Sequence, residues 1–236
     1  MTEAARVGAS LLVGALAAWG VREVVGGFAQ DGPWRPGRCP HCGAGLGAAD
    51  TLPFVHPSGV LCKACGAPVP ASAWLDLLTL LGTVLIVSWA PAWALARDLL
   101  VLWLGLAAGA IDVGRRVIPN RLLLAGLALG LLALWPIGLA AYVQGAVGAA
   151  LLLALGIVVA WVGRGGFGMG DVKYLALAGG LLGWQRGLAA LFIAVLGGGL
   201  YAAWLLLTRR ASGKDAFAFG PFIALGTVLA LALGAR

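Results

Sequence analysis

The chain has 236 residues, of which 61% are hydrophobic and 11% charged, and its mean hydropathy is +0.99. This composition excludes an ordinary soluble domain, because apolar runs of about 18 residues or more recur and each can cross a bilayer. We predict an all-α polytopic membrane protein, since lipid offers no hydrogen-bond partner to an unpaired backbone. The net charge of +7 then needs no nucleic-acid partner. It fits basic loops that hold the protein's orientation and face anionic membrane lipids.

The apolar runs predict about eight transmembrane helices. The first, at residues 7–28, is long for a signal peptide and lacks a small-residue cleavage site, so we expect it to be retained. The other predicted spans are residues 74–95, 98–111, 122–137, 140–162, 172–183, 187–208 and 219–233. The chain therefore divides into a first span within residues 1–28, a polar insert at 29–73, and a membrane core of about seven spans at 74–236.

Basic residues orient these spans. If the N-terminus lies outside and eight spans alternate, only Arg6, Arg97, Arg186 and Arg236 of the 16 Lys and Arg residues fall outside. This asymmetry follows the positive-inside rule. We therefore expect the insert, and the loops that follow the third and fifth spans, on the cytoplasmic side.

Four cysteines lie in the insert as two matched pairs, Cys39 with Cys42 and Cys62 with Cys65. Each pair has the spacing C-x2-C, and 19 residues separate the pairs. Two such knuckles suit a closed tetrahedral zinc site, in which four thiolates leave no open position, so the metal would be structural. A cytoplasmic location disfavours disulfides. Two reduced dithiols, or a redox C-x-x-C, are the alternatives.

Asp171 stands out in the stretch GGFGMGDVK at residues 165–173. Glycine is unfavourable in a helix, so we expect the run up to Gly170 to be non-helical and Asp171 to mark the start of a membrane helix. An ionisable residue at such a boundary is a functional candidate, and a simple helix cap is the alternative.

Asp112 is the second candidate, because it ends the third predicted span on the same membrane face as Asp171. Two carboxylates that share one proton activate water in aspartic proteases. One acts as a base toward the water, and the other protonates the carbonyl oxygen. In a membrane transporter the same pair would be proton-relay residues, and a non-catalytic scaffold with a zinc ribbon is a further alternative.

The helix dipole predicts how such a pair would share its proton. Asp171 lies at a helix N-terminus, where negative charge is favoured, and Asp112 lies near a helix C-terminus, where it is disfavoured. We therefore expect Asp112 to hold the proton more often and Asp171 to carry the charge.

Motifs in a fixed order give the chain a resemblance to type IV prepilin peptidases. They are the paired Cys-x-x-Cys insert, AWLDLLT from residue 73, Ile111-Asp112 with Ile118-Pro119-Asn120, the GxGD element Gly168-Met169-Gly170-Asp171, and FGPFIALG from residue 219. The last segment has Pro near the first position of a helix, and the resemblance implies that it packs near the two aspartates.

The resemblance implies an intramembrane aspartyl endopeptidase of the bacterial inner membrane that serves type IV pili or type II secretion. Such an enzyme removes the basic leader of prepilins and pseudopilins after a glycine. Asp112 and Asp171 occupy the two catalytic positions of the family.

The resemblance also implies N-methylation of the newly exposed residue with S-adenosylmethionine. Family members usually carry an Asn-containing stretch that ends in Tyr-Arg or His-Arg near the end of the first span. Residues 17–23 read AAWGVRE here, so only Arg22 corresponds. The sequence assigns no residue to S-adenosylmethionine, no particular pilin and no oligomeric state.

Overall fold

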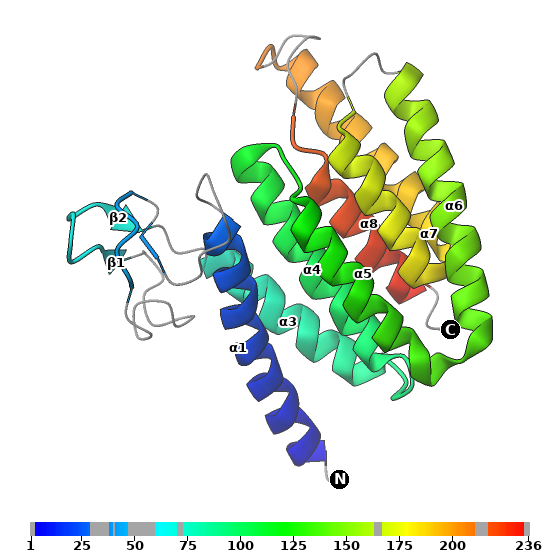
Figure 1. Cartoon of the computed structure of the whole chain (residues 1–236), viewed down its shortest axis with the longest axis horizontal. Helices are drawn as coiled ribbons and strands as arrows, with labels where there is room; N and C mark the ends of the chain where they lie inside the picture. Colours follow the sequence, from blue (N-terminus) through cyan, green and yellow to red (C-terminus); the bar gives the residue numbers. More distant parts are fainter. Residues whose placement is uncertain are drawn as a thin grey trace. The chain divides into compact units, whose positions relative to one another are not determined.

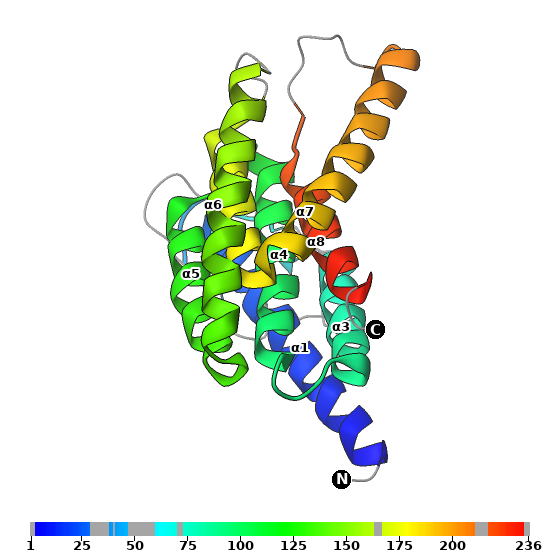
Figure 2. The ribbon, with the colours of Figure 1, turned by 90° about the vertical axis from the view of Figure 1, so that its right-hand side faces the viewer.

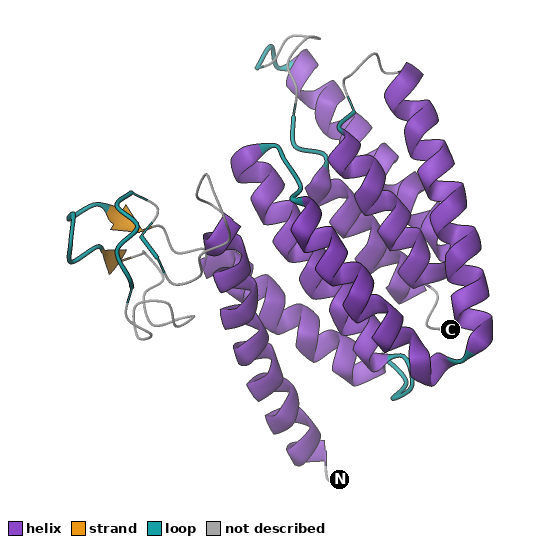
Figure 3. Ribbon diagram, viewed as in Figure 1, coloured by secondary structure: helices purple, strands orange, loops and turns teal. Residues whose placement is uncertain are grey.

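The computed structural model describes residues 3–28, 38–39, 41–46, 60–69, 73–162, 167–210 and 217–233. These residues form seven α-helices, a two-stranded antiparallel ribbon and one 3-10 helix (Figures 1 and 3). The elements are α1 (Glu3–Phe28), β1 (Val60–Leu61), β2 (Pro68–Val69), α3 (Ala73–Trp89), α4 (Leu95–Arg115), α5 (Asn120–Leu134), η1 (Trp135–Ile137), α6 (Leu139–Val162), α7 (Met169–Leu207) and α8 (Gly220–Leu233). The chain divides into two compact units, Met1–Trp89 and Ala90–Arg236.

In the first unit α1 packs against α3. A Cβ added at Gly14 of α1 would lie 2.7 Å from the Cδ1 atom of Leu80 on α3, so the glycine permits this close approach. Arg22 of α1 forms an ion pair with Asp76 of α3, whose side chain is fully buried. Because a buried carboxylate without a partner is strongly destabilising, this pair fixes how the two helices align.

In the second unit the chain reverses within α7. Gly183 has φ 78° and ψ 170°, which interrupts the helix. The first arm and the second arm run in opposite directions on either side of this residue (Figure 2, yellow and gold). A Cβ at Gly187 would lie 3.2 Å from the Cα atom of Gly179, whereas eight residues of straight helix span about 12 Å. The interruption falls at residue 183, where the sixth predicted span ended.

Glycines bring α6 and the first arm of α7 into backbone contact. A Cβ at Gly145 would lie 2.3 Å from the carbonyl oxygen of Gly180, and one at Gly148 would lie 2.4 Å from that of Gly179. Small residues at helix interfaces permit this packing in membranes, where the hydrophobic effect does not drive helices together. The second unit therefore has a tight interior, although its outer surfaces are rich in exposed Leu, Val and Trp.

The helices support the membrane class. Four of the described helical segments are long and apolar enough to cross a bilayer, namely Arg6–Phe28, Asn120–Ile137, Leu139–Trp161 and Met169–Leu207. The helices α3 and α8 are apolar but shorter, with 17 and 14 residues. The described chain is thus a mostly helical membrane protein.

The structure corrects the bounds of the third predicted span. α4 begins at Leu95 and continues to Arg115, whereas the prediction covered residues 98–111. The charged residues Arg97 and Asp98 lie inside the first turn of α4 because they form an ion pair. The Arg97 Nη2 and Asp98 Oδ1 atoms are 2.7 Å apart. The helix ends where Arg116 adopts the left-handed conformation, with φ 54°.

Candidate active site

Asp112 lies in the last turn of α4 and is 4% exposed. Its Oδ2 atom accepts a hydrogen bond from the N–H of Gly220, the first residue of α8, at 2.8 Å. A Cβ at Gly220 would lie only 2.9 Å from the same oxygen. Glycine is therefore the residue that lets the backbone approach this carboxylate without displacing it.

Asp171 lies in the first turn of α7, three residues after the N-cap residue Gly168. Its carboxylate accepts a hydrogen bond from the N–H of Gly168, as the third helical residue does in a capping box. The helix already begins at Met169, so the expectation that Gly170 is non-helical was wrong. The cap explains the difference, because the carboxylate satisfies a backbone N–H that the helix start would leave unpaired.

One oxygen of Asp171 has no partner. The Oδ1 atom is buried, and none of the described residues forms a hydrogen bond with it. Buried carboxylate oxygens normally carry a proton or bind a donor. This atom is therefore available to a proton, a water molecule or a substrate group.

The structure brings the two predicted aspartates to one site. Asp112 is close enough to Asp171 to interact with it electrostatically. The rings of Phe167 and Phe219, which directly precede Gly168 and Gly220, meet edge to face with 5.2 Å between their centroids. The segment before α7 and the segment before α8, which bind the two carboxylates, are thus in contact through these rings.

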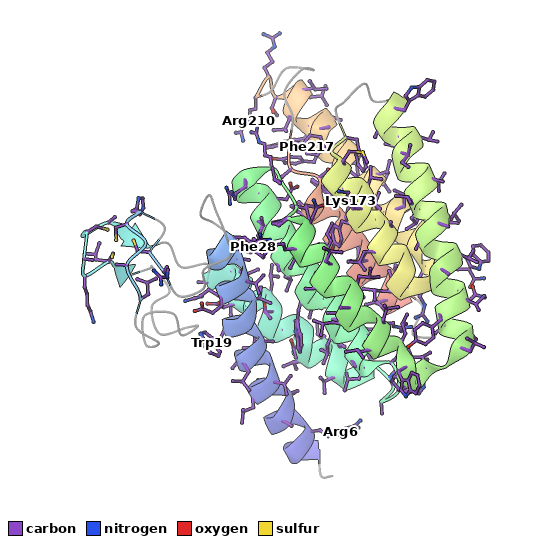
Figure 4. The ribbon with its side chains drawn as sticks, in the orientation of Figure 1. Arg6, Trp19, Phe28, Lys173, Arg210 and Phe217 are labelled. Carbon is purple, nitrogen blue, oxygen red and sulfur yellow. The ribbon has the colours of Figure 1, made fainter. Side chains whose placement is uncertain are left out.

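An aromatic cluster extends this contact, and the sequence analysis missed it. It consists of Phe167, Tyr201, Trp204, Phe217, Phe219 and Phe222, with centroid distances from 5.2 to 6.3 Å. Arg210 lies over the ring of Trp204 at 5.0 Å, and Figure 4 shows Arg210 and Phe217 at the same end of the second unit. The spacing F-x-F-x-x-F at residues 217–222 was the available signal.

Lys173 belongs to a different surface from Asp171. Its Nζ atom donates to the Oδ1 atom of Asn120 at 2.9 Å. Both residues line one end of an apolar groove of about 810 Å³ between α5, α6 and the first arm of α7. The Lys173 side chain therefore binds α5 and does not contribute to the aspartate pair.

The four cysteines come together outside the helices. Their sulfur atoms all lie within 4.8 Å of one another. The distance is 3.7 Å between the Sγ atoms of Cys39 and Cys65, and also between those of Cys42 and Cys62. The predicted cluster of Cys39, Cys42, Cys62 and Cys65 is thus present.

Two nearly identical turns build this cluster. Gly43 and Gly66 have φ of 72° and 68°, and their N–H groups bond to the carbonyl oxygens of Cys39 and Cys62 at 2.9 and 2.7 Å. In each turn the residue before the first cysteine pairs through its backbone with the residue seven positions later. Arg38 pairs with Gly45 in a β-bridge, and Leu61 pairs with Pro68 in the β1–β2 ribbon. The turn glycines follow each Cys-x-x-Cys pair directly because the left-handed φ disfavours any residue with a Cβ.

Known proteins resemble this chain in sequence. The profile of the type IV leader peptidase family matches residues 99–203. A prepilin leader peptidase/N-methyltransferase of Aeromonas hydrophila is 31% identical over 209 residues, which cover 83% of this chain and 71% of the relative. The chain belongs to the type IV leader peptidase family.

Other members of the family show similar agreement. Proteins with the same name from Bacillus subtilis strain 168 and Dickeya chrysanthemi are 31% and 34% identical over 203 and 217 residues. These matches cover 83% and 85% of this chain, and 81% and 74% of the relatives. No solved structure matches the chain. The family resemblance inferred from the motifs is confirmed.

The family profile includes both aspartates but not the whole site. Asp112 and Asp171 lie within the matched residues 99–203, whereas α8 and the cysteine cluster lie outside them. The contact between Asp112 and Gly220 therefore joins the matched segment to a helix beyond it.

The cysteine cluster fits a tetrahedral metal ion. Zinc–sulfur bonds of about 2.3 Å give a tetrahedron with edges of about 3.8 Å, close to the two shorter sulfur–sulfur distances. The N–H groups of Cys65 and Ala64 point at the Cys62 sulfur and lower the pKa of that thiol to about 6. His41 is exposed and contributes only its backbone N–H, which lies 3.4 Å from the Cys39 sulfur. His56 lies outside the described residues.

Proposed function

We propose that this protein is a prepilin leader peptidase that works as an intramembrane aspartyl endopeptidase. It cleaves the basic leader from type IV prepilins and pseudopilins after a glycine, at the cytoplasmic face of the bacterial inner membrane. The observation that carries the proposal is the electrostatic interaction between Asp112 and Asp171 in a member of the type IV leader peptidase family. The names of the relatives support the substrate class.

The chemistry needs two carboxylates with one proton between them. The ionised carboxylate takes a proton from water while the water oxygen attacks the peptide carbonyl, and the protonated carboxyl hydrogen-bonds to the carbonyl oxygen. A peptide inside a helix has its backbone groups paired, so the substrate is extended at the cut. A glycine before the scissile bond favours such an extended segment.

The proposed topology has eight spans, with the N-terminus outside. They are α1, α3, α4, α5, α6, the two arms of α7, and α8. In this arrangement the end of α4, the start of α7 and the start of α8 all lie on the cytoplasmic side, at one depth. The excess of Lys and Arg residues on that side supports the assignment.

We propose zinc as the ion held by Cys39, Cys42, Cys62 and Cys65. The sulfur–sulfur distances and the matched turns support this assignment. Four thiolates fill a tetrahedral shell, so the ion would hold the segment 29–73 together and take no part in hydrolysis. Binding would also neutralise thiolate charges that repel one another in the metal-free cluster.

We propose N-methylation, with S-adenosylmethionine as the methyl donor, as a second activity. The names of the relatives support it. Arg22, which corresponds to the family's basic residue at the end of the first span, pairs with Asp76. No residue is assigned to this cofactor.

The cleavage proposal is tested by incubating the purified full-length protein with a prepilin and comparing it with Asp112→Asn and Asp171→Asn. Either substitution keeps the shape of the side chain but removes the ionisable group, so cleavage should fall by about 100-fold or more. Glu23→Gln removes a partly exposed acid from α1 and serves as the matched control. Normal cleavage by both aspartate variants would exclude the catalytic pair and favour the transporter or scaffold alternatives.

A further inference from the structure

We infer that the two aspartates have fixed and different roles, with Asp112 as the ionised base and Asp171 as the protonated acid, and that the N–H of Gly220 sets this division. The inference rests on the proposed peptidase function and adds to it. It reverses the proton placement expected from the dipoles of α4 and α7, because that expectation did not include α8.

Asp112 is bound by the N-terminus of α8. The N–H of Gly220 donates to its Oδ2 atom at 2.8 Å, and the N–H of Phe219 is a second backbone donor to the carboxylate. Free N–H groups at a helix start favour a negative charge, both through the hydrogen bond and through the helix dipole. Asp112 therefore lies at the end of α4 but receives the electrostatic effect of the start of α8.

Asp171 has a weaker set of donors. The N–H of Gly168 binds one oxygen, and the other oxygen is buried without a partner among the described residues. An unpaired charged oxygen in a buried position is more costly than a neutral hydroxyl in the same place. Of two interacting carboxylates, the one with the unpaired oxygen therefore takes the proton.

No other titratable side chain of the described residues opposes this assignment. From α7 the facing group is Asp171 itself, while Lys173 binds Asn120 on α5. α8 contains no Asp, Glu, His, Lys or Arg residue, and neither does the segment 117–120. On α4 the cations that follow Asp112 are Arg115 and Arg116, and both are exposed.

The assigned roles give a balanced reaction. As the water oxygen bonds to the carbonyl carbon, one water proton moves to Asp112 and the proton of Asp171 moves to the carbonyl oxygen, which leaves a neutral gem-diol. Asp112 then gives its proton to the leaving nitrogen as the C–N bond breaks, and a hydroxyl of the gem-diol returns a proton to Asp171. Both carboxyl groups end in their starting states.

An amide-to-ester replacement at position 220 tests the inference. Nonsense suppression with glycolic acid in place of Gly220 removes the N–H and adds no atoms beside Asp112. The pH profile of kcat is then measured with a synthetic prepilin peptide that contains the leader and the following apolar segment. The acid limb reports ionisation of the first carboxyl, and the basic limb reports loss of the second proton.

The two limbs separate the two possible assignments. If Asp112 is the ionised member, losing the N–H destabilises the active singly protonated state, so the acid limb moves up by about one pH unit and the basic limb stays in place. A shift of the basic limb alone would overturn the inference, because it would mean that Asp112 holds the proton. An equal loss of rate at every pH would overturn it too, since Gly220 would then have only a structural role.

A matched ester controls for the weakened helix. Leucic acid in place of Leu225, which is 51% exposed on α8, removes an N–H that bonds within the helix and does not donate to Asp112, so it should shift neither limb. Gly220→Ala is a second variant, since its Cβ would lie 2.9 Å from Oδ2 and push the carboxylate off the donor, so the acid limb should again move up. If the unmodified enzyme does not cleave the peptide, the peptidase proposal fails and not the assignment of roles.

Discussion

The amide nitrogen of Gly220 lies 2.8 Å from the Oδ2 atom of Asp112, although the two residues are 108 positions apart in the chain. This contact places a helix N-terminus against a carboxylate that also lies near a helix C-terminus. The contact explains why position 220 is glycine, because a side chain there would touch the carboxylate. It also makes the start of α8 a part of the aspartate site, although the family profile ends before that helix.

The reversal inside α7 depends on Gly183. Its φ of 78° with ψ of 170° is a conformation that residues with a Cβ rarely adopt, so Gly183→Ala should lower the free energy of unfolding by about 1–3 kcal/mol. Gly180→Ala is the matched control, because its Cβ would meet only the Ala149 Cβ at an ordinary 3.7 Å. In this helical position alanine should be neutral or stabilising by up to about 1 kcal/mol. Thermal unfolding in detergent, followed by tryptophan fluorescence, measures the stability of both variants. Equal effects of the two substitutions would contradict the reversal of α7 at Gly183.

Metal removal should affect the insert and leave hydrolysis largely intact. We expect the purified protein to contain one zinc ion per chain, and Cys39→Ser to reduce the bound zinc because the tetrahedral shell loses a ligand. His41→Ala is the control and should retain the metal, since its side chain is not among the clustered ligands. Elemental analysis gives the zinc content. Full occupancy in the serine variant, or loss of zinc in the alanine variant, would show that the ligand set is wrong.

Asp98 is the partner of a buried arginine at the opposite end of α4 from Asp112. Asp98→Asn leaves the buried guanidinium of Arg97 without its counter-charge, which should destabilise the protein by about 3 kcal/mol. The double variant Arg97→Gln with Asp98→Asn should recover part of that loss, because the buried Arg97 guanidinium is removed, although Arg186 still loses its attraction to Asp98. Peptide cleavage at low temperature should stay normal in both. A double variant no more stable than the single one would contradict the pairing.

Phe167 holds the segment before Asp171 against the segment before α8. Because its edge-to-face contact with Phe219 is worth about 1 kcal/mol, Phe167→Ala should lower kcat by about fivefold to tenfold and change KM little. Phe192→Ala removes a ring that is 69% exposed on the outer surface and provides the control. Steady-state kinetics with a prepilin peptide distinguish the two. A change confined to KM would mean that Phe167 contacts the substrate and does not position the site.

Local patterns in the chain were sufficient for much of this description. Apolar runs gave the helical membrane class and most helix bounds, because the cost of placing backbone groups in lipid depends on each segment by itself. The cysteine spacing gave the paired knuckles, since a C-x2-C turn and its following glycine close within a few residues. Asp112 and Asp171 were found because each carboxylate lies at the end of an apolar run.

Only the tertiary structure decided what surrounds those two carboxylates. The donors to Asp112 come from α8, the aromatic cluster draws rings from three segments, and Arg97 and Asp98 allow α4 to begin earlier than the charges suggested. Hydropathy and dipole arguments treat each helix alone, so they assigned the proton to Asp112. Which of two buried carboxyl groups holds the proton depends on the backbone N–H groups that donate to each of them. Here those N–H groups come from segments far apart in the sequence, so only the folded structure identifies them.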